Sequence, residues 1–199
     1  MDSKKSFFTP PEAILAGSLV IALAILVVGG TISVPLKAVK GVKTENVQAP
    51  QPTQAIAPGP ATVAVENPSI KTFQAKKDAV ILKEEGKPVI FLFSTTWCPH
   101  CQWISQTFDK VVKEYVNSGK IKAYHFEVDT GDNTLTAEKE TQVPKNYLEV
   151  YKEFNPGGSI PTFVFGAKYF RVGNGYEQQK DLVSEEAEFK AVIDDLLKS

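Results

Sequence analysis

Residues 91–101 read Phe-Leu-Phe-Ser-Thr-Thr-Trp-Cys-Pro-His-Cys and contain both cysteines of the 199-residue chain. They follow Val89 and Ile90, so a run of β-forming residues ends in a short polar turn just before Cys98. A helix that begins near Cys98 would place the first thiol where unpaired N–H groups and the positive end of the helix dipole stabilise an anion. Such a thiol is acidic and reactive. This stretch therefore predicts a strand-to-helix junction that carries a reactive cysteine pair.

The composition of the chain argues against several classes of function. The formal net charge is −1 and 43% of the residues are hydrophobic, so the chain can build a core but has no general affinity for nucleic acid. Two cysteines cannot build a disulfide framework, and one Cys-x-x-Cys pair supplies at most half of a zinc site. His100 and His125 are the only histidines, so a four-ligand zinc site would also need carboxylates. Redox chemistry is the simplest interpretation of the pair.

Residues 13–34 form an uncharged run, AILAGSLVIALAILVVGGTISV, after a short polar segment at 1–12. The run has 22 residues, and ~20 apolar residues are needed for a helix to cross a bilayer. We expect an uncleaved transmembrane signal anchor; a cleaved signal peptide and a buried core helix are the alternatives. Two lysines precede the run and three follow it closely, which does not favour export of the C-terminal part. The short leading segment and a disulfide-forming pair nevertheless favour a single-pass protein of the cell membrane with an extracytoplasmic C-terminal domain.

Residues 35–69 are rich in Pro, Ala, Thr, Gln and Val and show no apolar periodicity. Proline-rich segments favour extended polyproline II conformations, so this part is expected to be a semi-stiff linker. The remaining residues, 70–199, are expected to form the folded domain.

The apolar spacing of residues 70–199 predicts an alternation of helices and strands. Parallel pairing of the first strands and a hairpin of the last two would give an α/β fold, a central mixed sheet with helices on both faces. The expected elements are a helix at 73–85, a strand at 89–93, a helix from the cysteines to about 117, a strand at 121–128, a polar excursion at 129–145 with a short helix near Ala137, a helix at 146–154, strands at 162–165 and 168–172 joined by a tight turn at 166–167, and a last helix with Ser184 as its N-cap.

Two motifs give residues 70–199 a family resemblance. Trp97-Cys98-Pro99-His100-Cys101 opens a helix after a strand, and Ser159-Ile160-Pro161-Thr162 begins a later strand before a hairpin and a terminal helix. In this combination the domain resembles the thioredoxin superfamily. The resemblance implies a thioredoxin fold in which Cys98 is the nucleophile, Cys101 resolves the mixed disulfide, and no cofactor is needed beyond the reversible Cys98–Cys101 disulfide.

The two residues between the cysteines also resemble a subset of the family. Pro99 and His100 are similar to the dipeptide of DsbA-type oxidases, which implies an oxidising poise, and His100 can favour the Cys98 thiolate through a hydrogen bond or charge. The domain has no room for the long helical insertion of DsbA proteins. Its architecture is closer to that of membrane-tethered thioredoxin-like proteins.

Three further residues are assigned to substrate binding by the resemblance. Pro161 matches the family's cis-proline, which lies beside the active cysteines, and Ile160 would offer its backbone to an incoming peptide. Trp97 would form a shelf beside the reactive sulfur. A trans proline that opens an edge strand is the alternative for Pro161.

One position departs from the family. A buried acid often stands six residues before the first cysteine and assists proton transfer at the second one, but here that residue is Leu92. Water, Glu127 or Asp129 could take over this role, although two acids at a strand end are more often solvated. His125 is interpreted as a strand residue.

These observations predict a membrane-tethered thiol:disulfide oxidoreductase that acts on cysteine-containing proteins, in the oxidising direction. A membrane redox partner would recycle it, either a quinone-linked oxidase or a reductant-transfer protein. The alternatives are a non-catalytic binding or tethering module with this fold and a metal-delivery protein.

Overall fold

The computed structural model describes residues 58–199, so the expected anchor at 13–34 and most of the expected linker lie outside the described part. Within residues 58–199, no helix combines the length and the apolar character needed to cross a membrane. The elements are β1 (Thr62–Val63), β2 (Gln74–Lys76), β3 (Lys83–Glu84), β4 (Lys87–Ser94), α1 (Pro99–Asn117), β5 (Lys122–Glu127), β6 (Asp132–Asn133), α2 (Lys145–Phe154), β7 (Thr162–Phe165), β8 (Tyr169–Val172), the 3-10 turn η1 (Glu177–Gln179) and α3 (Leu182–Leu196).

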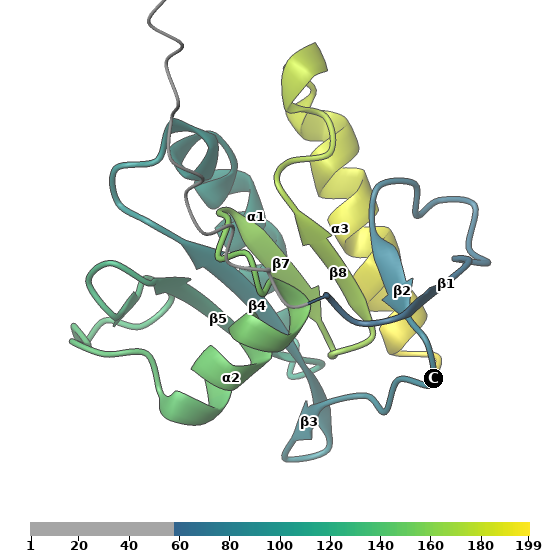
Figure 1. The fold of residues 1–199 in the computed structure, drawn as a ribbon, viewed down its shortest axis with the longest axis horizontal. Coiled ribbons are helices and arrows are strands. Elements are labelled where there is room, and N and C mark those ends of the chain that lie inside the picture. The colour runs from purple at the N-terminus through teal and green to yellow at the C-terminus, as the bar shows by residue number, and fades with distance from the viewer. Residues whose placement is uncertain (1–57) are drawn as a thin grey trace, which may run out of the picture. The chain divides into compact units, whose positions relative to one another are not determined.

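A single mixed sheet runs through this part of the chain in the order β1-β2-β8-β7-β4-β5-β6, with β3 paired to the start of β4 (Figure 1). Strand β4 pairs in parallel with β5 and antiparallel with β7, and β7 and β8 form an antiparallel hairpin. The expected parallel pairing of the first strands and the terminal hairpin are therefore confirmed. The turn of the hairpin also agrees, because Gly166 and Ala167 both have positive φ values, 61° and 50°.

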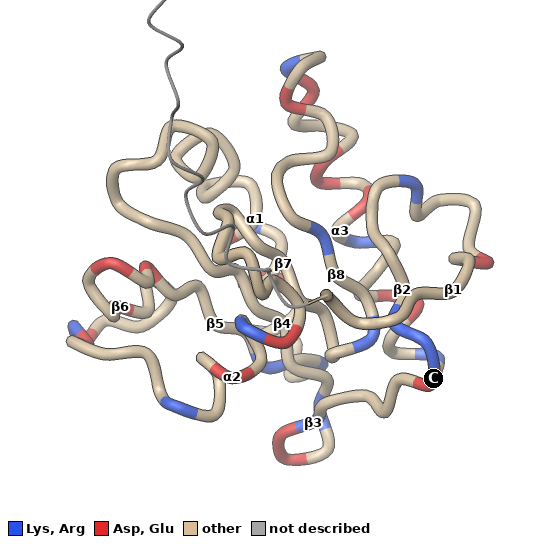
Figure 2. The backbone as a smooth tube through the Cα atoms, viewed as in Figure 1, with Lys and Arg blue, Asp and Glu red and all other residues tan. Residues whose placement is uncertain are grey.

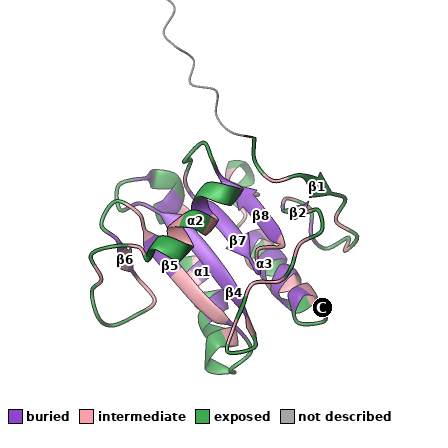
Figure 3. Ribbon diagram, turned by 60° about the horizontal axis from the view of Figure 1, so that its bottom comes forward, coloured by how far each residue is buried: buried purple, intermediate pink, exposed green. Residues whose placement is uncertain are grey.

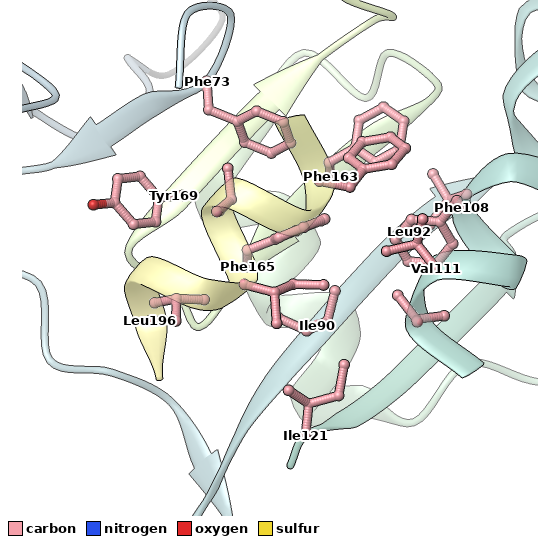
Figure 4. Packing of buried hydrophobic residues seen from close by; sticks show 14 of the residues in the cluster. Phe73, Ile90, Leu92, Phe108, Val111, Ile121, Phe163, Phe165, Tyr169 and Leu196 are labelled. Carbon is pink, nitrogen blue, oxygen red and sulfur yellow. The ribbon is translucent and has the colours of Figure 1, made fainter. Parts of the chain in front are cut away.

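Helices cover both faces of the sheet, and the side chains of β4 alternate between them. Ile90 and Leu92 pack with side chains of α1 and α3 in the larger core cluster, which Figure 4 shows from close by. Phe91 and Phe93 point the other way, toward α2. Because both faces of β4 are covered, the strand is an uninterrupted apolar run, and Figure 3 shows it buried along its length.

Acidic and basic residues are interspersed over the described elements, as Figure 2 shows. This distribution agrees with the formal net charge of −1 for the whole chain.

The helix expected at 73–85 is wrong. This segment contributes β2, which pairs with β1 and β8, and β3, which pairs with β4. Phe73 is buried against Phe165, with ring centroids 5.1 Å apart, and Asp78 and Glu85 have positive φ values of 52° and 50° that end each short strand. The pairing of β2 with the distant β8, the local β3–β4 hairpin and the burial of Phe73 outweigh a weak local preference for helix.

Two other local expectations also differ from the structure. Helix α3 begins at Leu182, and its N-cap is Asp181, not Ser184. The Asp181 carboxylate accepts hydrogen bonds from the Ser184 backbone N–H (3.0 Å) and hydroxyl (2.7 Å), so Ser184 is the capped residue and Asp181 the cap. The segment at 129–145 forms β6 and turns in place of a helix near Ala137, because the buried Asn133 side chain accepts a hydrogen bond from the His125 backbone N–H (3.0 Å).

The sheet also reaches into residues that the sequence assigns to the linker. In β1, Thr62 lies opposite Lys76 and Val63 opposite Ala75. Asn67 accepts a backbone hydrogen bond from Ile70, and its side chain donates to Asp195 of α3 (3.4 Å). Residues from about Thr62 onward thus pack with the folded domain.

Candidate active site

The cysteine pair lies where β4 passes into α1. Cys98 is the N-cap of α1, with extended backbone angles (φ −78°, ψ 120°), and Pro99 is the first helical residue. Proline suits this position because its fixed φ matches the helix and its missing N–H would have no intrahelical partner. The Cys98 carbonyl accepts the first helical hydrogen bond, from Gln102 (3.0 Å). The expected strand-to-helix junction at the cysteines is confirmed.

Both cysteines are free thiols, and both are buried. Cys98 is 4% exposed and Cys101 is 1% exposed, whereas Trp97 is 68% exposed. Two residues between the cysteines at a helix start predict an exposed first thiol and a buried second one, and this expectation is wrong for Cys98. The Cys98 side chain is covered by the surrounding protein and lies close enough to Cys101 to raise the pKa of that thiol. The solvent-facing side chains of the motif are those of Trp97, Pro99 and His100.

The surroundings of Cys101 hold it in the protonated form. Burial in the protein raises the pKa of the Cys101 thiol to about 12, and the adjacent Cys98 adds to this rise. The Thr95 backbone N–H is the main group that opposes it. The Thr95 hydroxyl oxygen is buried and has no hydrogen-bond partner within residues 58–199, so it is free to turn toward a thiolate on Cys101. Thr95 is thus the residue placed to stabilise charge on the second sulfur.

His100 is held from the C-terminal side of the chain. Its Nδ1 lies 2.8 Å from Oε1 of Glu177, and its backbone carbonyl accepts a hydrogen bond from the Asn174 side chain (2.9 Å). Asn174 also donates to Oε2 of Glu177 (2.8 Å). The sequence did not single out Asn174 or Glu177, because they stand more than 70 positions from His100 and share no motif with it.

The Ile160–Pro161 peptide bond is cis, as the family resemblance implies. Phe93 lies opposite Thr162 in the pairing of β4 with β7, so Pro161 continues that register next to Ser94, at the end of the sheet from which the cysteine turn departs. The Pro161 carbonyl accepts a hydrogen bond from Gly173 (2.8 Å). Ile160 is half-buried and Pro161 is buried. The residues expected to bind substrate thus gather at the same end of the sheet as the cysteines.

A buried hydrogen-bonded chain lies on the α1 side of the sheet. The Ser94 hydroxyl is 2.9 Å from Nε2 of His125, and Nδ1 of His125 is 2.7 Å from Oδ1 of Asp109 on α1. His125 is on β5, as expected, and is 2% exposed. The sequence gave no signal for its pairing with Asp109, because the contact depends on how α1 lies over β5.

The two acids considered as substitutes for Leu92 have separate environments. The Asp129 carboxylate accepts hydrogen bonds from the Thr96 backbone N–H (3.2 Å) and hydroxyl (2.6 Å), in the turn before the cysteines. Partial desolvation works against its ionisation, but these hydrogen bonds outweigh it and lower the pKa of Asp129. Glu127 accepts a hydrogen bond from Thr130 (3.4 Å). Asp129 therefore ties the turn to the end of β5 as a carboxylate.

A protein metal site needs three or four ligating side chains close together. Within 58–199, no three or more His, Cys, Asp or Glu side chains lie close enough together to hold a metal ion. The cysteine pair therefore has no third protein ligand in this part of the chain.

A mixed sheet between helices, a Cys-x-x-Cys pair at a strand-to-helix junction and a cis-proline at the neighbouring strand define a thioredoxin-type domain. The pattern of the thioredoxin-like domain family matches residues 75–190. A thioredoxin of Geodia cydonium is 31% identical over 87 residues, which are 43% of this chain and 74% of that protein. The chain belongs to the thioredoxin-like family.

Proposed function

We propose that the protein is a thiol:disulfide oxidoreductase that acts on cysteine-containing proteins through Cys98 and Cys101. The observation that carries the proposal is the contact between two free thiols at the N-terminus of α1, with the second thiol held protonated by burial. An asymmetric pair of this kind separates an attacking sulfur from a resolving one. Family membership supports the same chemistry.

The proposed reaction is thiol–disulfide exchange. In the oxidising direction, a substrate thiolate attacks the Cys98 sulfur of the Cys98–Cys101 disulfide, the S–S bond breaks, and the Cys101 sulfur leaves as a thiolate that takes up a proton. A second substrate thiolate then attacks the substrate sulfur of the mixed disulfide and expels Cys98. The substrate loses two electrons to the cysteine pair, and its two thiols become one disulfide. The reverse sequence reduces a substrate disulfide.

Substrate binding is assigned to three residues around the pair. Trp97 presents a large exposed aromatic surface next to Cys98, on which an apolar side chain of a substrate can pack. The backbone of Ile160, ahead of Pro161, is proposed to pair with the substrate chain. Pro99 and His100 complete the catalytic motif. No cofactor beyond the cysteine pair is proposed.

The cellular setting is proposed from the sequence. Residues 13–34 would anchor the protein in the cell membrane as a single-pass helix, with the catalytic domain extracytoplasmic. The oxidising direction is supported by the Pro99-His100 dipeptide alone. Catalysis in one direction needs a membrane redox partner that restores the cysteine pair, a quinone-linked oxidase for oxidation or a reductant-transfer protein for reduction.

Activity assays with purified full-length protein test this proposal. We expect the wild type to accelerate both insulin reduction by dithiothreitol and oxidative refolding of a reduced, disulfide-containing protein. Cys98→Ser should abolish both activities, and Cys101→Ser should accumulate a mixed disulfide with substrate through Cys98. If neither the wild type nor Cys98→Ser exceeds the uncatalysed rate, the protein is a binding module and not an oxidoreductase.

A further inference from the structure

The loop after β8 contacts the cysteine motif and holds His100, the histidine of that motif. Glu177 opens the 3-10 turn η1, and its carboxylate lies 2.8 Å from Nδ1 of His100. The Asn174 amide nitrogen donates to both the His100 carbonyl oxygen (2.9 Å) and the Glu177 carboxylate (2.8 Å). Three residues from two distant segments thus form one closed cluster at the start of α1.

The chemistry of the partners fixes the roles within this cluster. A carboxylate can only accept hydrogen bonds, so Nδ1 of His100 carries a proton and donates it to Glu177. Both partners of the Asn174 amide are acceptors, so its NH₂ group must face them, which leaves its buried Oδ1 atom without a partner within residues 58–199. Desolvation works against ionisation of Glu177, but the hydrogen bonds from Asn174 and His100 outweigh it and lower its pKa. Glu177 is therefore a carboxylate at neutral pH.

A buried ion pair keeps this loop in place. Arg171 of β8 is 5% exposed and bonds to Glu185 of α3 at 2.6 Å. Arg171 also donates to the Gly173 carbonyl (3.1 Å), and Glu185 accepts from the Tyr176 backbone N–H (2.8 Å). The backbone of Gly175 passes so close that a Cβ atom there would lie 2.5 Å from the guanidinium. The segment between β8 and η1 is thus tied to charged groups in the core, and Glu177 is held against His100.

The charges of Glu177 and His100 show how Glu177 affects the stability of a thiolate on Cys98. With the carboxylate present, the pair of side chains carries a charge of −1 if the imidazole is neutral and zero if it is protonated. Without the carboxylate, the same two states carry zero and +1. Whatever the protonation state of His100, Glu177 makes the immediate surroundings of the motif more negative, and a thiolate is less favourable there.

We propose that Glu177 is a positioning residue that sets the redox poise of the Cys98–Cys101 pair by pairing with His100. Only the reduced protein can carry a thiolate, so a group that disfavours the thiolate disfavours the reduced form and makes the pair a weaker oxidant. The Pro99-His100 dipeptide alone suggests a strong oxidant, and Glu177 moderates it. This inference rests on the proposed thiol:disulfide activity of the same pair.

The test is the equilibrium of the full-length protein with glutathione. Glu177→Gln keeps a side chain of the same shape and removes the charge, and we expect it to shift the equilibrium toward the reduced protein by up to about tenfold, or ~30 mV for a two-electron couple. Alkylation of Cys98 by iodoacetamide at pH 7 should become faster by a similar factor. The matched control is Glu186→Gln, because Glu186 also joins the C-terminal region to α1, through Lys110 (2.9 Å), with a side chain 27% exposed against 29% for Glu177.

A second variant separates the charge effect from a change of structure. In a His100→Gln background, Glu177→Gln should shift the glutathione equilibrium less, because the imidazole that holds the carboxylate against the motif is gone. The inference is overturned if Glu177→Gln leaves the equilibrium within the error of the wild type, or if Glu186→Gln moves it equally. If the wild type itself exchanges no disulfides with glutathione, the proposed function fails. An active wild type with an unshifted Glu177→Gln variant removes only the role of Glu177.

Discussion

His125 lies directly opposite Leu92 in the parallel pairing of β5 with β4, on the face of the sheet that α1 covers. The family resemblance leads one to expect an acid at position 92, and the chain has an apolar side chain there. A half-buried carboxylate is nevertheless present close by, because Asp109 of α1 pairs with the buried His125 at 2.7 Å. The carboxylate on this side of the sheet thus comes from α1, where it pairs with β5, and not from position 92 of β4.

The first prediction concerns the contribution of the His125–Asp109 pair to the stability of the fold. Asp109→Ala leaves a buried imidazole donor without its acceptor, and we expect the free energy of unfolding to fall by about 1–3 kcal/mol. Asp194→Ala is the control, since Asp194 bonds to the Tyr115 hydroxyl at an exposed site (2.9 Å). Urea unfolding followed by circular dichroism measures both variants. Equal losses in the two variants would contradict a special role for the buried pair.

The second prediction concerns the Thr95 hydroxyl next to Cys101. Thr95→Val removes the hydroxyl that can turn toward a thiolate on Cys101, so opening of the Cys98–Cys101 disulfide by a substrate thiol should become slower. Thr134→Val is a matched control, because the Thr134 hydroxyl is also buried without a partner within residues 58–199. Stopped-flow tryptophan fluorescence gives the rates. A slower reaction in both variants would point to general loosening of the fold.

The third prediction is a pH dependence of stability that comes from Cys101. The folded protein raises the pKa of this thiol from 9.0 to about 12, so above pH 9 the unfolded chain releases a proton that the folded protein retains. Its contribution to the stability of the reduced protein is therefore complete below pH 9 and declines as the pH rises toward 12. The free energy of unfolding of the reduced wild type should fall more between pH 8 and pH 10.5 than that of Cys101→Ala, which lacks this thiol. Parallel pH profiles for the two proteins would refute this assignment.

The fourth prediction concerns the buried ion pair of Arg171 and Glu185, which holds the loop between β8 and η1 in place. Arg171→Met leaves Glu185, which is fully buried, without its cation, and we expect a loss of about 3–5 kcal/mol in the free energy of unfolding. Lys76→Met breaks a surface pair with Glu153, and its cost should be about 0–1 kcal/mol. Guanidinium unfolding curves distinguish the two. A small loss in Arg171→Met would mean that Glu185 takes up a proton or a water molecule in the absence of the cation.

Much of the sheet could be predicted from sequence because its central strands carry strong signals. The run at 89–93 is apolar on both faces, and glycine breaks or tight turns bound the strands at 162–165 and 169–172. The segment at 73–85 could not be predicted in this way. Strand β2 forms because β8, which is distant in sequence, offers it a backbone partner, and β3 forms because it makes a tight hairpin with the start of β4.

In the candidate site, too, residues in short local motifs could be predicted and residues that depend on long-range contacts could not. Cys98, Cys101 and Pro161 were found because they stand in short motifs, and the motifs also located the helix start. Glu177, Asn174 and Asp109 were missed because each acts through a contact across the fold. The inward turn of Cys98 was missed for a related reason, since exposure depends on side-chain direction and not on spacing.

The covered position of Cys98 limits which reagents can reach its sulfur. The exposed groups of the motif are the indole of Trp97, the pyrrolidine of Pro99 and the imidazole of His100, whereas the Cys98 side chain is buried. A polypeptide seated across those rings brings its own sulfur into line at close range. We therefore expect free peroxides to oxidise Cys98 more slowly than an exposed thiolate, because access to the sulfur limits the reaction as well as its nucleophilicity.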